Sequence, residues 1–223
     1  YIDSGNLIAI RDEAKYKLRF QNFATFYHGI KGEPYAPEYE RQYTLHNFPK
    51  LNLVVLGLNS AWEIDHHYTA RAGVHSGAIT NALEELRRIP SHDRRLKVAV
   101  WHHPIHSNSE DRITDHGFLQ RLAASGFRIA LHGHIHKAEN NFFRYDMSTG
   151  GRKLDLVCAG TFGAPTRQWV PGYPLEYNLL KVYSDKVVVE TRHRAEREGA
   201  WKPYAVWTQG PGKDPLPRYE VKL

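Results

Sequence analysis

Histidine is the residue type whose spacing in this chain most clearly predicts chemistry. Two histidine groups directly follow apolar runs, one after residues 96–101 (LKVAVW) and one after residues 127–131 (FRIAL). Neutral imidazole is a common ligand for zinc, iron, manganese and nickel. A single histidine near a strand end more often satisfies a loop carbonyl, but two groups after consecutive apolar runs predict a metal site. The groups are His102, His103 and His106, and His132, His134 and His136.

The elements around the histidines follow a recognisable order. The central part of the chain alternates apolar runs of strand length with helical spacings, which predicts an α/β layer with crossover connections. Shorter apolar runs follow, separated by Gly, Pro and Asp, and these favour antiparallel strands. The expected strands are 41–48, 51–58, 96–101, 127–131, 141–145, 154–159, 177–183 and 186–191, and the expected helices are 13–27, 79–90 and 117–124.

This order of elements explains how the two histidine groups would meet. Ligands of open α/β sheets bind at the carboxyl ends of the strands, and both groups stand at such ends. Pro104 would stop the first strand, and Gly133 would let the second backbone turn without a side chain in the way. His134 and His136 are two positions apart, so in an extended backbone both would point into one cavity.

Composition limits the classes of function. The chain has 223 residues, 14 histidines, one cysteine and a formal net charge of +6. A single cysteine, Cys158, excludes an internal disulfide framework and a thiolate zinc site, and fits a reducing, cytoplasmic location. No apolar run approaches the roughly 20 residues of a membrane helix, so no membrane partner is expected. The positive charge would suit an anionic substrate, although a surplus of surface lysine and arginine is the better explanation, because no basic stripe has regular spacing.

Two motifs at this spacing resemble a known family. His102-His103-Pro104 follows a strand, and an amphipathic helix, another strand and Gly133-His134-Ile135-His136 come next. This pattern resembles the C-terminal half of a calcineurin-like metallophosphoesterase. The Leu58-Asn59-Ser60 turn and the Ala159-Gly160-Thr161-Phe162 turn are similar too, and the resemblance covers roughly residues 20–201.

The resemblance implies a fold, a cofactor and an activity. The fold would be a four-layer αββα sandwich with a dinuclear metal centre between two sheets. His102 and His134 would bind the second metal and His136 the first, while His103 would be structural or would support a ligand. Two divalent ions (Mn, Fe, Zn or Ni) would clamp a phosphate ester, and a metal-bound hydroxide would attack phosphorus without a protein nucleophile. The implied enzyme is a phosphodiesterase or phosphatase, and a nucleotide or nucleic acid suits the charge better than a sugar phosphate.

The family's earlier motifs do not stand in place here. They are Asp-x-His, Gly-Asp and Gly-Asn-His followed by an acid, and they carry the bridging carboxylate and the catalytic histidine. Asp65-His66-His67 fits the first formally, but it lies in a loop past its strand. We therefore expect the N-terminal half of the domain to precede Tyr1 and assign no catalytic residue within this chain. The expected domains are an incomplete phosphoesterase domain over 1–201 and a Pro/Gly-rich extension or linker over 202–223, with a further domain after it.

Other functions and roles remain open. The chain could be a catalytically inactive partner or regulatory module of the same fold, or a nucleic-acid-binding module that uses charge and aromatic rings. Packing is the better explanation for Trp62, Tyr68 and Trp101, and capping of a helix is the better one for Asp115. Glu139 could support a ligating histidine. The candidates for substrate contact are His106, Asp111, His116 and Asn59, although a turn role explains Asn59 equally well.

Overall fold

The fold is organised around a six-stranded mixed sheet. The computed structural model describes residues 2–4, 7–9, 12–107, 110–148, 153–163, 172–196 and 198–223. The four central strands of the sheet run parallel, and one antiparallel strand is added at each edge. In spatial order the strands are β3 (Tyr43–Phe48), β4 (Leu53–Leu58), β5 (Leu96–Val100), β6 (Ile129–His132), β8 (Lys153–Cys158) and β7 (Glu139–Arg144).

A second, antiparallel sheet packs against the first. Its long central strand β10 (Lys186–Arg194) pairs with β9 (Leu175–Val182) on one side. On the other side it pairs with β12 (Arg218–Lys222) and the short β11 (Lys202–Pro203). The segment after residue 201 thus supplies two strands of this sheet. A separate two-stranded hairpin, β1 (Ile2–Ser4) and β2 (Leu7–Ala9), lies at the N-terminal end.

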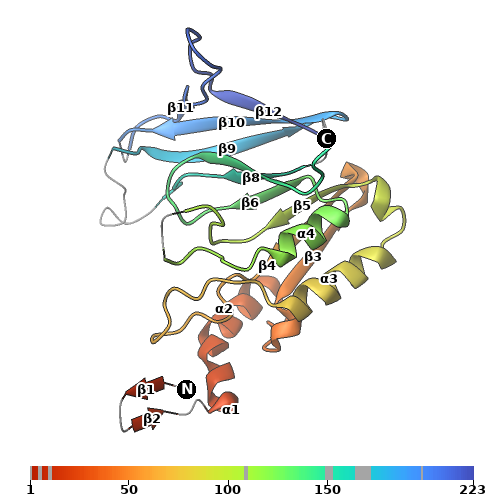
Figure 1. Cartoon of the computed structure of the whole chain (residues 1–223), viewed down its shortest axis with the longest axis vertical. Helices are drawn as coiled ribbons and strands as arrows, with labels where there is room; N and C mark the ends of the chain where they lie inside the picture. The colour runs from red at the N-terminus through yellow and green to blue at the C-terminus, as the bar shows by residue number, and fades with distance from the viewer. Residues whose placement is uncertain are drawn as a thin grey trace.

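Two helices cover one face of the six-stranded sheet (Figure 1). Helix α3 (Ser76–Arg88) ends before Pro90, which disfavours a helical residue ahead of it, and α4 is Gly117–Ala124. The apolar positions recur at helical spacing and form the buried faces of the two helices. Those positions are Ala78, Ile79, Ala82, Leu83 and Leu86 in α3, and Phe118, Leu119, Leu122 and Ala123 in α4.

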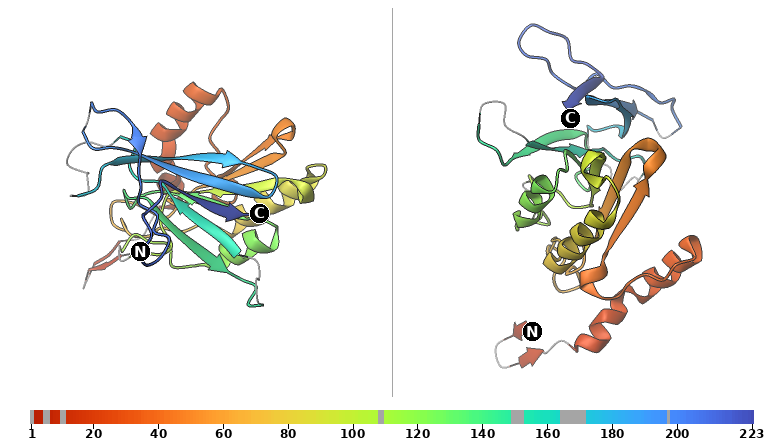
Figure 2. Two further views of the ribbon diagram at one scale, coloured as in Figure 1. Left: turned by 90° about the horizontal axis from the view of Figure 1, so that it is seen from above. Right: turned by 90° about the vertical axis from the view of Figure 1, so that its right-hand side faces the viewer.

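The first expected helix, 13–27, is interrupted. It divides into α1 (Glu13–Lys17), a 3-10 turn (Leu18–Phe20) and α2 (Gln21–Lys31), which project from the β3 end of the molecule (Figure 2). Three of its aromatic rings, Phe20, Phe23 and Tyr27, pack around Tyr35 with centroid distances of 6.1, 4.9 and 5.7 Å. No residue of α2 is buried, so aromatic contacts take the place of a core here.

Two hydrophobic clusters define three layers. One fills the space between α3, α4 and the six-stranded sheet, and includes Val54, Leu56, Ala99 and Leu156. The other lies between the two sheets and includes Ile129, Val157, Val187, Val189 and Val221. Strands β6 and β8 are thus buried on both faces, as expected for parallel strands in α/β proteins, whereas in β4 and β5 only the residues facing the helices are fully buried.

The four-layer αββα arrangement is not confirmed. Among the described residues no helix covers the outer face of the second sheet (Figures 1 and 2). Cross-strand ion pairs stand on that sheet instead, with Lys181 Nζ 2.7 Å from Glu190 Oε1 and Lys186 Nζ 2.8 Å from Glu220 Oε1. The described fold is therefore a helix layer, a mixed sheet and an antiparallel sheet. No helix in the described part of the chain is long and apolar enough to cross a membrane.

Candidate metal centre

Strands β5 and β6 deliver the two histidine groups to one edge of the sheet. The strands are parallel neighbours, with Val98 opposite Ile129 and Val100 opposite Leu131. His102 and His134 each follow the last residue of their strand by two positions. The amide of Gly133 donates to the carbonyl of His102 over 3.0 Å, which ties the two loops together. The structure thereby brings the two groups into contact.

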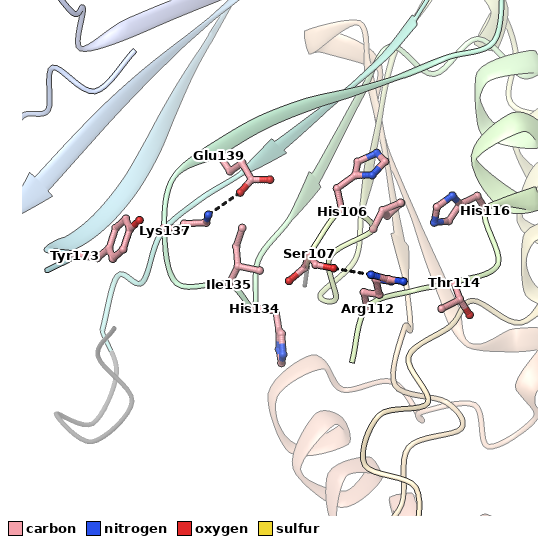
Figure 3. A pocket seen from close by; sticks show the side chains of 11 residues that line it. His106, Ser107, Arg112, Thr114, His116, His134, Ile135, Lys137, Glu139 and Tyr173 are labelled. Atoms are coloured by element: carbon pink, nitrogen blue, oxygen red, sulfur yellow. Dashed lines mark hydrogen bonds and ion pairs between the residues drawn. The ribbon is translucent and has the colours of Figure 1, made fainter. Parts of the chain in front are cut away.

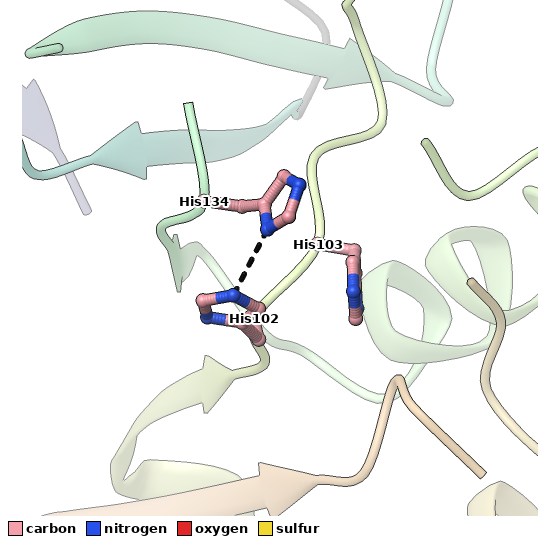
Figure 4. A group of neighbouring side chains, drawn as sticks. All are labelled: His102, His103 and His134. Carbon is pink, nitrogen blue, oxygen red and sulfur yellow. Dashed lines mark hydrogen bonds between the residues drawn. The ribbon is translucent and has the colours of Figure 1, made fainter. Parts of the chain in front are cut away.

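The imidazoles of His102, His103 and His134 form a compact group with metal-ligand geometry (Figure 4). One ring nitrogen from each lies within 4.8 Å of the other two. The closest pair is His102 Nε2 and His134 Nδ1, which are 3.0 Å apart. Two nitrogens bound to one tetrahedral zinc ion would stand about 3.3 Å apart. A small outward movement of either ring would therefore accommodate one divalent ion between them.

Ser60 fixes the first histidine group through three contacts of its side-chain hydroxyl. Its hydroxyl oxygen accepts the backbone N–H groups of His102 and His103, each over 3.2 Å, and lies 2.8 Å from His103 Nδ1. A hydroxyl has two lone pairs and one proton, so the proton is left to donate to Nδ1. The neutral tautomer of His103 then carries its proton on Nε2. This pattern agrees with a supporting role for His103 in the free protein.

A carboxylate orients the second group. Asp111 forms a very short contact with His134 Nε2, on the side of the ring opposite His102. Ligating histidines commonly donate their other N–H to a carboxylate, which fixes the tautomer and makes the ligand more basic. The sequence had suggested Asp111 only as a substrate contact. Its contact with His134 was not visible because 23 residues separate the two positions.

The cluster favours neutral imidazoles, which are the form that binds metal. Burial, followed by the charges of His134 and His136, lowers the pKa of His102. Burial and the neighbouring histidines lower the pKa of His103 to about 4. His132, which lies inside β6, also has a lowered pKa because it is buried.

The loop after β6 differs from the extended backbone that the sequence suggested. The strand ends at His132, and His134 and His136 both adopt left-handed conformations, with φ of 74° and 57°. An added Cβ at Gly133 would meet His102 Nδ1 at 3.8 Å, an ordinary contact, so Gly133 does not relieve a clash. The alternation of side chains therefore does not apply to this loop. His136 is outside the group of three, although its charge acts on His102, and its metal role stays a prediction.

A cavity of about 930 Å³ opens beside His134 (Figure 3). His106 and His116, whose ring centroids are 6.0 Å apart, contribute to its wall. Two cationic side chains, Arg112 and Lys137, also line it. Lys137 Nζ lies 3.1 Å from Glu139 Oε2, so Glu139 is directed toward this lysine. The cavity combines imidazole, guanidinium and ammonium groups with the single carboxylate of Glu139, so its cationic side chains outnumber its acidic one and suit an anionic ligand.

Several other residues weighed from the sequence have structural roles. The Asn59 amide donates to Tyr35 Oη and Gln42 Oε1 and accepts from the Ala61 amide. Asp115 accepts the amide of Gly117, the first residue of α4, but the N-cap position belongs to His116, so Asp115 supports the helix start from one residue before the cap. Trp101 is buried against Phe118, and Asp65 accepts two backbone amides of its own loop.

Comparisons with known proteins give a weak structural similarity. No protein-family model and no curated protein matches the chain. Two solved structures of Vps29 from Entamoeba histolytica are similar, one of a single mutant and one of the wild type complexed with zinc. Both have 12% identity and a TM-score of 0.28, and they cover 76% and 75% of this chain and 98% of theirs. Similarity at this level is too weak to assign a fold or an activity.

Proposed function

We propose that this chain carries part of a metal-dependent phosphoester hydrolase, with its metal held at the histidine cluster. The observation that carries the proposal is the 3.0 Å approach of His102 Nε2 and His134 Nδ1 from two different strands. In the free protein these two nitrogens share a hydrogen bond, and a divalent ion would take the place of the shared proton when neutral imidazoles bind it.

The described residues suffice for one ion. His102 and His134 would be its principal ligands, His103 could complete the set after a change of tautomer, and Asp111 would hold His134 in place. Carboxylate bridges are typical of two-metal sites, and a second ion here would require oxygen ligands beyond this cluster. We therefore propose one ion for this chain and keep the two-ion centre, with His136 as a further ligand, as the prediction of the family resemblance.

The adjoining cavity supports an anionic substrate. Arg112 and Lys137 would attract and orient a phosphate group beside the cluster. A bound divalent ion would supply Lewis acidity and would make a coordinated water more acidic. His106, which lines the same cavity, could contact the substrate. A phosphodiester such as a nucleotide or oligonucleotide is the preferred class, because the net charge of the chain is positive.

Metal binding and hydrolysis are tested together with matched histidine variants. The purified full-length protein is loaded with Mn²⁺ or Zn²⁺, its bound metal is measured by mass spectrometry, and hydrolysis of bis(p-nitrophenyl) phosphate is followed. His102→Ala and His134→Ala should lose both metal and turnover. The control His46→Ala, an exposed histidine on β3, should retain both.

The outcomes separate the proposal from its alternative. Unchanged metal content in His102→Ala and His134→Ala would contradict the metal centre. Metal bound by the full-length wild type without hydrolysis of bis(p-nitrophenyl) phosphate would contradict the hydrolase and favour the inactive regulatory module.

A further inference from the structure

A second cavity lies at the opposite ends of the same strands. It has a volume of about 560 Å³. Asn52 lines it just before β4, Leu96 and Lys97 where β5 begins, and Arg128 just before β6. The turn between β9 and β10 closes its other side with Tyr183 and Ser184. The five residues of β5 span about 16 Å, so this cavity is well separated from the histidine cluster.

The lining of this second cavity is strongly basic. Four cationic side chains face one carboxylate, that of Asp93. Arg95 bonds to Asn47 and to the Pro90 carbonyl, and Arg128 donates to Tyr145 Oη over 3.0 Å. These partners are neutral, and none of the four cations forms an ion pair with an acidic group in the described ranges. Most of the positive charge is therefore uncompensated. The four are Arg94, Arg95, Lys97 and Arg128.

Lys97 is the most informative member of the group. Its residue is only 3% exposed, and its ammonium, which forms no hydrogen bond or ion pair with the described residues, reaches the cavity rather than being fully enclosed. It occupies the same face of β5 as Ala99, opposite Val54, where the helix-side core begins. A Cβ added at Gly126 would lie 3.1 Å from Lys97 Nζ, so the side chain extends under the end of α4. The stem of Lys97 is buried while its ammonium is only partly hydrated, and this partial desolvation without an anionic partner is unfavourable.

The electrostatic environment of Lys97 also favours an anionic ligand. Burial lowers its pKa, the charge of Asp93 partly offsets this effect, and the nearby charge of Arg128 adds a smaller lowering. A bound anion would stabilise the charged form of this ammonium, because it supplies the opposite charge that the surrounding residues do not. Residues that violate the local pattern at a cost to stability are commonly kept for binding or catalysis.

We propose that this second cavity binds a phosphate-bearing small molecule, whose phosphate is held by Lys97, Arg94 and Arg128. Arginine presents paired N–H groups that match phosphate oxygens, and lysine adds a compact charge. The volume is within the range of small-molecule sites. Tyr183 is 50% exposed on the wall and offers a ring on which a nucleobase could stack. The site stands independently of the proposed hydrolase, because it shares no residue with the histidine cluster or its cavity.

The test is calorimetric titration of the metal-free protein with pyrophosphate and with ADP. Lys97→Met should weaken binding of both by roughly tenfold or more, because a desolvated charge partner is lost. It should also raise the melting temperature of the ligand-free protein, since a partly desolvated ammonium without an ion-pair partner is removed. Arg94→Gln, at an exposed position, should weaken binding without affecting folding. ADP binding tighter than pyrophosphate binding identifies a nucleotide, and equal affinity identifies a simple phosphate compound.

Two control variants make the result decisive. Lys202→Met removes an exposed lysine from β11 and should bind both probes as the wild type does. Lys137→Met removes a lysine from the cavity beside His134, so any binding that this variant loses belongs to that cavity and not to the second one. The proposal is overturned if Lys97→Met binds like the wild type, if binding is lost in Lys137→Met and kept in Lys97→Met, or if the wild type binds neither probe at millimolar concentration.

Discussion

Replacement of Ser60 by alanine provides the sharpest test of how the histidine cluster is built. Ser60 is 2% exposed, and its hydroxyl serves the amides of His102 and His103 together with His103 Nδ1. Removing the hydroxyl leaves the amides of His102 and His103 without their acceptor and leaves His103 Nδ1 without its donor. Each unsatisfied buried group costs about 1–3 kcal/mol, and the two 3.2 Å bonds are long. We therefore expect Ser60→Ala to lower the free energy of unfolding by about 2–4 kcal/mol.

The measurement is urea denaturation of the metal-free protein, followed by metal titration of the folded variant. The urea midpoint should fall with an unchanged slope, and metal affinity should fall as well, because the backbone that carries His102 loosens. Ser76→Ala is the matched control, since Ser76 is exposed at the start of α3, and it should change stability by less than about 0.5 kcal/mol. If Ser60→Ala loses less than about 1 kcal/mol and binds metal normally, the assigned hydrogen-bond pattern is wrong.

Two further predictions concern pH and the second sheet. The pKa of His103 is about 4 in the folded protein and ordinarily 6.5, so the unfolded state alone takes up a proton as the pH falls from 6.5 toward 4. The contribution of neutral His103 to stability should therefore be complete above pH 6.5 and lost as the pH falls toward 4. The free energy of unfolding, measured by urea denaturation, should be about 2 kcal/mol lower at pH 5 than at pH 7. His103→Gln should flatten this profile, and an equally steep profile in that variant would assign the effect elsewhere. Val221 lies on β12 between the two sheets and is 1% exposed, so Val221→Ala should lower the free energy of unfolding by about 2 kcal/mol. Val182 is 54% exposed, so Val182→Ala should change it little. Equal effects of the two valine variants would show that β12 contributes no core.

The local structure was largely predictable from the sequence. The apolar runs 51–58, 96–101 and 127–131 became β4, β5 and β6 within a few residues, and residues 117–124 became α4. Hydrophobic periodicity reports which face of a segment is buried, and that information is local. The placement of the two histidine groups at neighbouring strand ends followed from the same reasoning, because a parallel sheet aligns its carboxyl ends.

The supporting contacts depend on the tertiary structure. Ser60 lies 42 and 43 residues before the histidines that it bonds, and no periodicity in the sequence connects them. The same holds for Asp111 at His134 and for the pairing of β12 with β10, which needs a long connection. The left-handed conformations of His134 and His136 are set by the loop in which they lie. Alternation of side chains applies only to extended backbone, so it could not place His136.

The sequence by itself determined the order of strands and helices and the positions of the imidazoles along them. Only the tertiary structure decided which of those imidazoles meet, which serine and aspartate hold them, and that a lysine within an apolar strand faces a basic cavity. The physical reason is that the burial pattern of a segment follows from the spacing of apolar residues along it, whereas contacts between distant segments depend on how whole layers pack.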